Sequence, residues 1–170
     1  MKKLLWVSVL AVGLGLGWRA WQGMTSSDAG DPKLIFDRLW VDHLPRSERD
    51  DVQVFVAVTE QPVGVFENRA RWKGAWELFR YERRSDGQMD LLFPHTRDRE
   101  RAGYRASRCH QDGFDFCLEL AGATRGTKRY YSRKGWEIGQ VKTPAALLDQ
   151  VGHLEQLVDE AAGLKPDDGQ

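Results

Sequence analysis

Two cysteines are the residues of this chain with the most specific chemistry. Cys109 and Cys117 are its only cysteines, and such a pair can bind a metal, act as a redox couple or form a structural disulfide. A strand would point His110 to the opposite face from Cys109, and a Cys-x-x-Cys redox motif is absent. These observations disfavour a metal site and a redox role. The remaining histidines lack metal-ligand spacing; they are His43, His95 and His153.

The chain contains no motif that names a reaction. Gly-x-Ser-x-Gly, a P-loop, Gly-x-Gly-x-x-Gly and His-Glu-x-x-His are all absent. Glu77 and Glu82 alternate with apolar residues, which is the pattern of a solvated strand face rather than of an acid–base pair. We therefore expect no enzyme, no cofactor and no metal.

Aromatic residues are abundant, with seven tryptophans in 170 residues. In one interpretation, aromatic residues on the expected strands line an apolar pocket inside a barrel, with Arg80 or Asn68 as the polar handle. In the other, the same side chains simply fill the barrel. Both interpretations stay open. The candidate ligand-binding residues are Phe66, Asn68, Trp72, Trp76, Arg80 and Tyr104.

A second candidate surface is the stretch 125–136, where basic residues interleave with aromatic ones. Its candidate partner-binding residues are Arg129, Arg133 and Lys134, which suit anionic headgroups, peptidoglycan or an acidic protein. The alternative is an ordinary solvated face. Residues 97–137 carry ten Lys/Arg against six Asp/Glu, and residues 144–170 carry one Lys against six Asp/Glu, so these two segments could attract each other. The formal net charge of zero argues against a nucleic-acid partner.

The first residues are typical of an export signal. A Met-Lys-Lys start precedes the uncharged residues 4–17. Residues 1–22 are interpreted as a cleaved signal peptide or an uncleaved membrane anchor. Trp18 and Trp21 favour the anchor, as does the absence of an Ala-x-Ala cleavage site. In both interpretations residues 23–32 are a linker, and the rest of the chain lies on the periplasmic side of a bacterial inner membrane or in the periplasm.

An oxidising compartment makes a disulfide the expected state of the cysteine pair. The dipeptide Asp112-Gly113 predicts a turn between the cysteines. A three-residue turn centred on Gly113 would place Cys109 directly opposite Cys117, with Cβ atoms about 4.5–5.5 Å apart, near disulfide reach. We expect the pair to stabilise a β-hairpin.

The elements that must position these residues form one mainly β domain, residues 33–163. Short alternating segments separated by turn residues predict an antiparallel up-and-down barrel of seven or eight strands, or a sandwich. A short helical start within residues 33–43 should lead into a strand through Trp40. Thr143 as N-cap and Pro144 as first helical residue predict an amphipathic helix over 144–162, followed by a disordered tail at 164–170. The seven clearer strands are expected at 52–59, 63–71, 75–83, 88–93, 100–108, 114–120 and 127–138.

An eight-stranded barrel followed by an amphipathic helix resembles the lipocalin, or calycin, architecture, in outline over Asp37 to Ala162. Lipocalins begin the barrel with Gly-x-Trp, where this chain has Arg38-Leu39-Trp40 without the glycine. They also place a late arginine against that tryptophan, a place that Arg129 or Arg133 could take. A second Gly-x-Trp, at residues 74–76, lies mid-barrel, where the family does not have it. The resemblance implies a barrel whose interior can hold a small ligand.

These observations predict a non-enzymatic binding protein of the cell envelope. Its expected ligand is an apolar or amphipathic small molecule, lipids included. The alternative is a membrane-anchored interaction module of a bacterial envelope assembly, which would hold its partner through the basic stretch 125–136.

Overall fold

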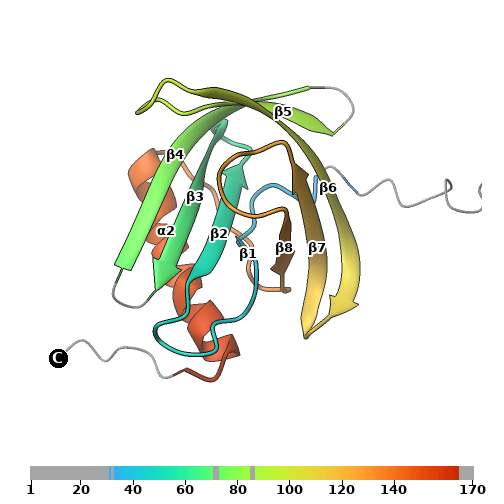
Figure 1. Ribbon diagram of the computed structural model, residues 1–170, viewed down its shortest axis with the longest axis vertical. Coiled ribbons are helices and arrows are strands. Elements are labelled where there is room, and N and C mark those ends of the chain that lie inside the picture. Colours follow the sequence, from blue (N-terminus) through green and yellow to red (C-terminus); the bar gives the residue numbers. More distant parts are fainter. Residues whose placement is uncertain (1–30, 32, 71–72, 85–86, 165–170) are drawn as a thin grey trace, which may run out of the picture.

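The computed structural model describes residues 31, 33–70, 73–84 and 87–164. It is a closed barrel of eight antiparallel strands in chain order with one helix after it (Figure 1). This single ring-like sheet confirms the predicted antiparallel β domain and decides between barrel and sandwich. Several predicted segments lie outside the described residues: the signal or anchor, the linker apart from Asp31, Trp72 and residues 165–170. The elements are β1 (Trp40–Val41), β2 (Val52–Val58), β3 (Val63–Ala70), β4 (Lys73–Arg83), β5 (Gln88–Leu92), β6 (Arg99–Gln111), β7 (Phe114–Ala121), β8 (Arg129–Ser132) and α2 (Pro144–Ala161).

The length of pairing differs along the barrel wall. β3 pairs with β4 over eight residues, Val63–Ala70, whereas β4 pairs with β5 only through its last four, Arg80–Arg83. β1 closes onto β8 through the pair Val41↔Tyr131. An isolated β-bridge between Arg38 and Glu137 extends this contact between the first and last parts of the barrel. The β4–β5 contact therefore leaves most of β4 without a strand on that side.

Aromatic rings pack against one another across the barrel interior. Alternate side chains of each strand point inward, and the ring centroids of Phe55 and Phe66 lie 5.1 Å apart. Phe79 and Tyr130 lie 6.0 and 5.8 Å from Phe55. This arrangement favours the interpretation in which these side chains fill the barrel. The same cluster includes Trp40, Tyr81, Met89, Leu91, Phe93, Phe116 and Leu118.

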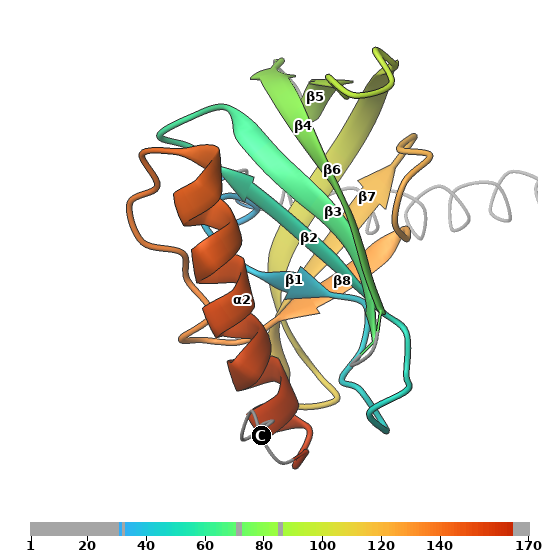
Figure 2. The ribbon, with the colours of Figure 1, turned by 90° about the vertical axis from the view of Figure 1, so that its left-hand side faces the viewer.

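Helix α2 lies along the outside of the barrel and covers the outer face of β1, β2 and β3 (Figure 2). Thr143 caps it as predicted, because its hydroxyl accepts a hydrogen bond from the Ala146 amide at 3.2 Å. Because the helix covers the outer face of β2 and the barrel core covers its inner face, this strand is buried on both faces. The apolar stripe of the helix consists of Leu147, Val151, Leu154 and Val158.

The acidic side chains of α2 pair with β3 rather than with the basic segment 97–137. Arg69 of β3 lies 3.3 Å from Glu155 and 2.7 Å from Asp159. Charge counts along the chain do not indicate which strand lies beside the helix, so the expected attraction was assigned to the wrong segment.

The segment before β1 closes one end of the barrel. The predicted helical start is wrong, because the described residues 33–37 form turns, with Leu34 donating to the Asp31 carbonyl at 3.0 Å. Trp40 points inward, and its indole N–H donates to the Ile35 carbonyl at 2.9 Å. Phe36 packs against Tyr81 and Tyr104.

The β6–β7 hairpin differs from the prediction in its register. The turn has two residues, Asp112 and Gly113, both at positive φ, and Gln111 pairs with Phe114. The two-residue turn moves the register by one position from the predicted three-residue turn, and a bulge between Arg108 and Gln111 moves it by one more. Ser107 rather than Cys109 therefore lies opposite Cys117. The two cysteines are nonetheless at disulfide distance, with Cα atoms 5.7 Å apart.

The last strand is shorter than predicted. β8 ends at Ser132 because a turn follows, in which the Trp136 amide donates to the Arg133 carbonyl and Gly135 adopts a φ of 86°.

Within the described part of the chain, no helix is long and apolar enough to cross a membrane.

Candidate ligand-binding cleft

A cleft of about 820 Å³ opens beside β4, on the side where β5 is missing. We call it the β4 cleft. Four consecutive residues of β4, Ala75 to Leu78, line it. Because neighbouring side chains of a strand point to opposite faces, the cleft follows the edge of the strand and reaches both of its faces. Its other lining residues are Gln53, Phe66, Glu67, Asn68, Pro94, His95, Arg125 and Gly126.

The cleft exists because the chain leaves the barrel wall after β5. Phe93 and Asp98 close a loop, with the Phe93 amide donating to the Asp98 carbonyl at 3.0 Å and Arg97 in it at a φ of 64°. This loop carries Pro94 and His95 along the open edge of β4 instead of continuing the ladder. The β7–β8 connection brings Arg125 and Gly126 to the same place.

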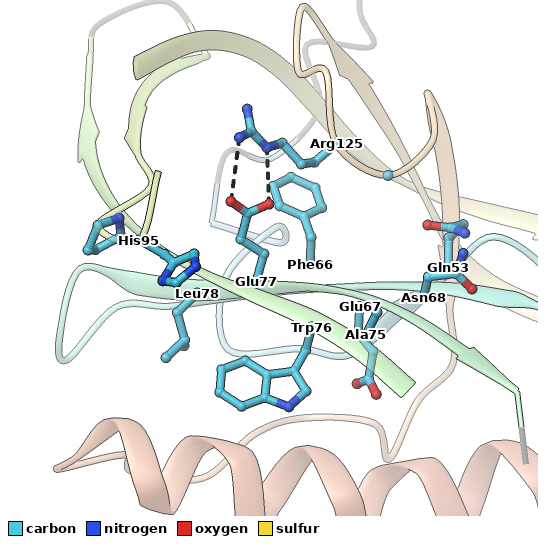
Figure 3. Close-up of a pocket in the computed structure, with 12 residues that line it drawn as sticks. Gln53, Phe66, Glu67, Asn68, Ala75, Trp76, Glu77, Leu78, His95 and Arg125 are labelled. Carbon is cyan, nitrogen blue, oxygen red and sulfur yellow. Dashed lines mark hydrogen bonds and ion pairs between the residues drawn. The ribbon is translucent and has the colours of Figure 1, made fainter. Parts of the chain in front are cut away.

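Arg125 connects three segments at the inner side of the cleft, and Figure 3 shows its contact with Glu77. Its Nε lies 3.1 Å from Glu77 Oε2, and its Nη2 lies 2.7 Å from Asp98. Its Nη1 donates to Glu100, whose side chain is only 9% exposed. The guanidinium also lies 3.9 Å from the ring centroid of Phe93. One arginine thus holds β4, the β5–β6 loop and the start of β6 together.

The charge of this cluster is negative. Three carboxylates, Glu77, Asp98 and Glu100, share the single cation of Arg125. The hydrogen bond from Arg125 holds the pKa of Asp98 below its usual range, and the same bond raises the pKa of Arg125. Because three carboxylates surround one guanidinium, the cluster favours a cationic or hydrogen-bond-donating group in the cleft.

Apolar and neutral polar groups complete the cleft. Phe66 forms part of its inner wall and Trp76 lies on the other side of β4, facing α2, together with Leu78 (Figure 3). Trp76 is 53% exposed and is the one large hydrophobic side chain exposed in the described part of the chain. The amides of Gln53 and Asn68 stand opposite each other on β2 and β3. Their side chains have no hydrogen-bond partner among the residues that the structure describes, so both amides are open to a ligand.

The six predicted ligand-binding residues do not form one interior pocket. Phe66, Asn68 and Trp76 line the β4 cleft, and Trp72 lies outside the described residues. Arg80 points outward from β4 and is exposed, beside Leu92. Tyr104 lies at the closed end, in edge contact with Phe36 at 5.9 Å.

Two expectations about β4 are wrong. Trp76 points out of the barrel, and Phe79 takes the inward place that the sequence suggested for Trp76. Glu77 was expected on a solvated face, but it shares the inward face with Phe79 and pairs with Arg125. Both faces of β4 carry large apolar residues because α2 lies beside the outer one, and alternation alone does not tell them apart.

The predicted partner-binding residues are not equivalent. The side chains of Arg129 and Lys134 are 73% and 79% exposed. Arg133 instead packs over Phe114 and Trp136, with ring centroids at 5.5 and 5.9 Å. Among the described residues, neither Arg129 nor Arg133 forms a hydrogen bond or a cation–π contact with Trp40, the place that the lipocalin resemblance implied.

Sequence reasoning missed most of the polar cleft residues. Arg125 and His95 come from two separate loops, and no local pattern joins them. One usable signal was the spacing of Glu77, Phe79 and Tyr81, which places the glutamate on the same strand face as two aromatic core residues. The other missed lining residues are Gln53, Glu67, Ala75, Leu78, Pro94 and Gly126.

The described residues contain no group of three or more His, Cys, Asp or Glu placed to hold a metal ion.

No protein-family model matches the chain, and comparison with curated proteins and with solved structures also finds no match.

Proposed function

We propose that this protein is a non-enzymatic binding protein and that its ligand occupies the β4 cleft. The ligand class is an apolar or amphipathic molecule of small size, lipids included. The observation that carries the proposal is the cleft of about 820 Å³ along the open edge of β4, a volume within the range of small-molecule sites.

The composition of the cleft supports an amphipathic rather than a purely apolar ligand. Phe66, Trp76 and Leu78 offer apolar surface. Asn68 and Glu77 offer polar groups a short distance away on the same strands. An apolar lining with a few convergent polar groups is the usual make-up of a ligand site.

The site lies beside the barrel rather than inside it. A barrel of eight strands has an interior just large enough for its own side chains or for one small ligand. Here the rings of Phe55, Phe66, Phe79 and Tyr130 occupy the centre. We therefore replace the interior pocket implied by the lipocalin resemblance with the β4 cleft.

The proposal is tested by filling the cleft. Ala75 lies on β4 inside the cleft, so Ala75→Trp should block it. Ala121 is an exposed strand alanine on β7, and Ala121→Trp is the matched control. The probe is dodecyltrimethylammonium, a cationic amphiphile, titrated below its micelle concentration by calorimetry.

We expect wild type and Ala121→Trp to bind the probe alike and Ala75→Trp to bind it at least about tenfold more weakly, a change of about 1.4 kcal/mol. Equal binding by all three folded proteins would place the ligand elsewhere. Native mass spectrometry of protein recovered without reductant adds a direct readout, because a retained ligand increases the mass until the protein is denatured.

The envelope location also remains a proposal, motivated by the basic start and the uncharged residues 4–17. The same mass spectrum tests it, since the mass of the chain reports whether residues 1–22 are still present. Recovery of the intact chain in a cytosolic fraction would contradict it.

A further inference from the structure

β4 has an open edge within an otherwise hydrogen-bonded barrel. On one side it pairs with β3 along Val63–Ala70. On the other side, among the described residues, β5 covers only Arg80–Arg83. Residues 73–79 therefore have no described strand partner on that side, and Ala75 to Leu78 line the β4 cleft there.

The direction of the free backbone groups follows from two hydrogen bonds. The Tyr81 amide donates to Pro62, toward β3, at 2.9 Å, and the Arg84 amide donates to Gln88, toward β5, at 2.8 Å. In an antiparallel ladder, successive residues direct their N–H and C=O groups to opposite sides. The even-numbered residues Gly74, Trp76 and Leu78 therefore direct theirs toward the open edge, where they have no backbone partner among the described residues. Of these three, Trp76 and Leu78 line the cleft.

An aliphatic tail does not satisfy such groups. Unpaired strand edges are a ready template for another strand, and main-chain hydrogen bonds then supply much of the affinity. The backbone of β4 is thus a more selective feature of the cleft than its apolar lining.

The side chains beside this edge define what a bound strand would carry. Residues opposite Trp76 and Leu78 would point outward, toward an apolar surface that includes an indole 53% exposed. A residue opposite Glu77 would point inward, toward the carboxylate of Glu77. Behind Glu77, Arg125 is shared with two further carboxylates, Asp98 and Glu100, which do not line the cleft themselves. The edge therefore fits alternating apolar and basic side chains.

We propose that the ligand of the β4 cleft is an extended peptide segment of a partner, in which apolar and basic residues alternate, and that it pairs with Gly74, Trp76 and Leu78 as an added antiparallel strand. This inference rests on the proposed function, whose ligand class it specifies. It also relocates the expected protein partner, from the basic stretch 125–136 to an acidic cleft.

The test uses peptide backbones that differ only in methylation. The parent probe is an acetylated and amidated seven-residue peptide of alternating valine and lysine. Valines opposite Trp76 and Leu78 would direct their N–H groups to β4, whereas a lysine opposite Glu77 would direct its N–H away. N-methylation of the valines therefore removes donors to the edge, and N-methylation of the lysines is the matched control.

We expect the full-length protein to bind the parent and the lysine-methylated peptide alike, measured by calorimetry. The valine-methylated peptide should bind at least about tenfold more weakly, because it cannot donate hydrogen bonds to Gly74, Trp76 and Leu78. Equal affinity for the two methylated peptides would overturn the strand pairing. Equal binding of a peptide with glutamate in place of lysine would overturn the charge preference.

A protein variant gives an independent readout. Trp76→Pro removes an N–H that faces the cleft and takes no part in the ladder to β3, so proline is tolerable at this edge. Trp76→Ala is its control, because it removes the indole and keeps the N–H. The peptide should lose more affinity with Trp76→Pro than with Trp76→Ala, and equal losses would contradict the inference.

The failures of the two proposals are distinguishable. If dodecyltrimethylammonium binds in the cleft and the parent peptide does not, the peptide inference is wrong and the proposed function stands. If the folded wild type binds neither probe, both are wrong.

Discussion

Arg125 and Glu77 face each other across the inner side of the β4 cleft, with Nε of the arginine 3.1 Å from Oε2 of the glutamate. The arginine comes from the β7–β8 connection and the glutamate from the open part of β4. Their ion pair joins two segments that share no strand ladder. It therefore limits the movement of the β4 edge relative to the loops that form the other side of the cleft.

Replacing this arginine should destabilise the fold. Arg125→Gln leaves Glu100, 9% exposed, and Glu77 without their cation. An unpaired buried carboxylate is unfavourable, and we expect the free energy of unfolding to fall by roughly 1–2 kcal/mol at pH 7. Urea denaturation measures this change.

The matched control is Arg129→Gln on the outer face of β8. Its side chain is 73% exposed and lies 3.9 Å from Glu119, so its loss should change stability by less than about 0.5 kcal/mol. Equal effects of the two substitutions would show that the Arg125 cluster is no stronger than a surface ion pair.

Both the backbone conformation at position 126 and the side chains around it require a glycine there. Its φ is 70°, and a Cβ there would overlap the Tyr130 hydroxyl and contact the Phe66 ring. Gly126→Ala should therefore lower the free energy of unfolding by about 2–3 kcal/mol, from backbone strain of about 1 kcal/mol plus overpacking. Thermal denaturation followed by circular dichroism measures the loss.

Gly135 separates these two contributions. Its φ is 86°, but nothing lies within 4 Å of the Cβ that alanine would add. Gly135→Ala should thus show the backbone strain alone, about 1 kcal/mol. A loss as large in Gly135→Ala as in Gly126→Ala would mean that the contact with Tyr130 is unimportant.

Much of the fold was predictable because its signals are local. Period-two alternation and turn residues such as Asp112-Gly113 predicted the strands from β2 to β7, and Thr143-Pro144 predicted the start of α2. The bulge in β6 was not predictable, because it depends on how two strands pair rather than on the residues of one.

The cleft was not predictable from the sequence for the same reason. It exists where β4 extends beyond its pairing with β5. The charged cluster beside it is formed by Glu77, Glu100 and Arg125, which are far apart along the chain. The sequence also placed Trp76 inside the barrel, since it does not reveal that α2 lies beside the outer face of β4.

The stability of the protein should fall as the pH rises toward 8. Burial raises the pKa of Glu155 to about 8 from its ordinary 4.5, and the neighbouring carboxylate of Glu67 adds to the shift. Between these two pH values the folded protein keeps a proton that the unfolded chain has lost. The free energy of unfolding therefore decreases from about pH 4.5 to about pH 8, by at least about 1 kcal/mol.

Glu155→Gln should reduce this dependence, because the amide stays neutral in both states, while the buried carboxyl of Glu67, whose pKa is also raised, retains part of it. Glu160→Gln, an exposed position on the same helix, should leave it unchanged. Urea denaturation between pH 5 and pH 9 compares the three proteins. The same slope in Glu155→Gln as in wild type would assign the dependence to other groups.

The cysteine pair should stabilise the β6–β7 hairpin against unfolding. Cys109 and Cys117 are eight positions apart and at disulfide distance. In the chain-entropy model, closing such a short loop stabilises the folded state by about 2–3 kcal/mol. The double substitution to serine should lower the free energy of unfolding by that amount, and reductant should lower the stability of wild type to the same level.

Reductant applied to the double-serine protein is the control, since that protein has no bond to break. The bulge makes the outcome informative, because Ser107 rather than Cys109 stands opposite Cys117 in the ladder. A bond from a bulged position holds the extra residue of β6 in place, so its loss should also speed amide exchange between Arg108 and Gln111. An unfolding midpoint and exchange rates that do not respond to reductant would show that the hairpin is held by its ladder alone.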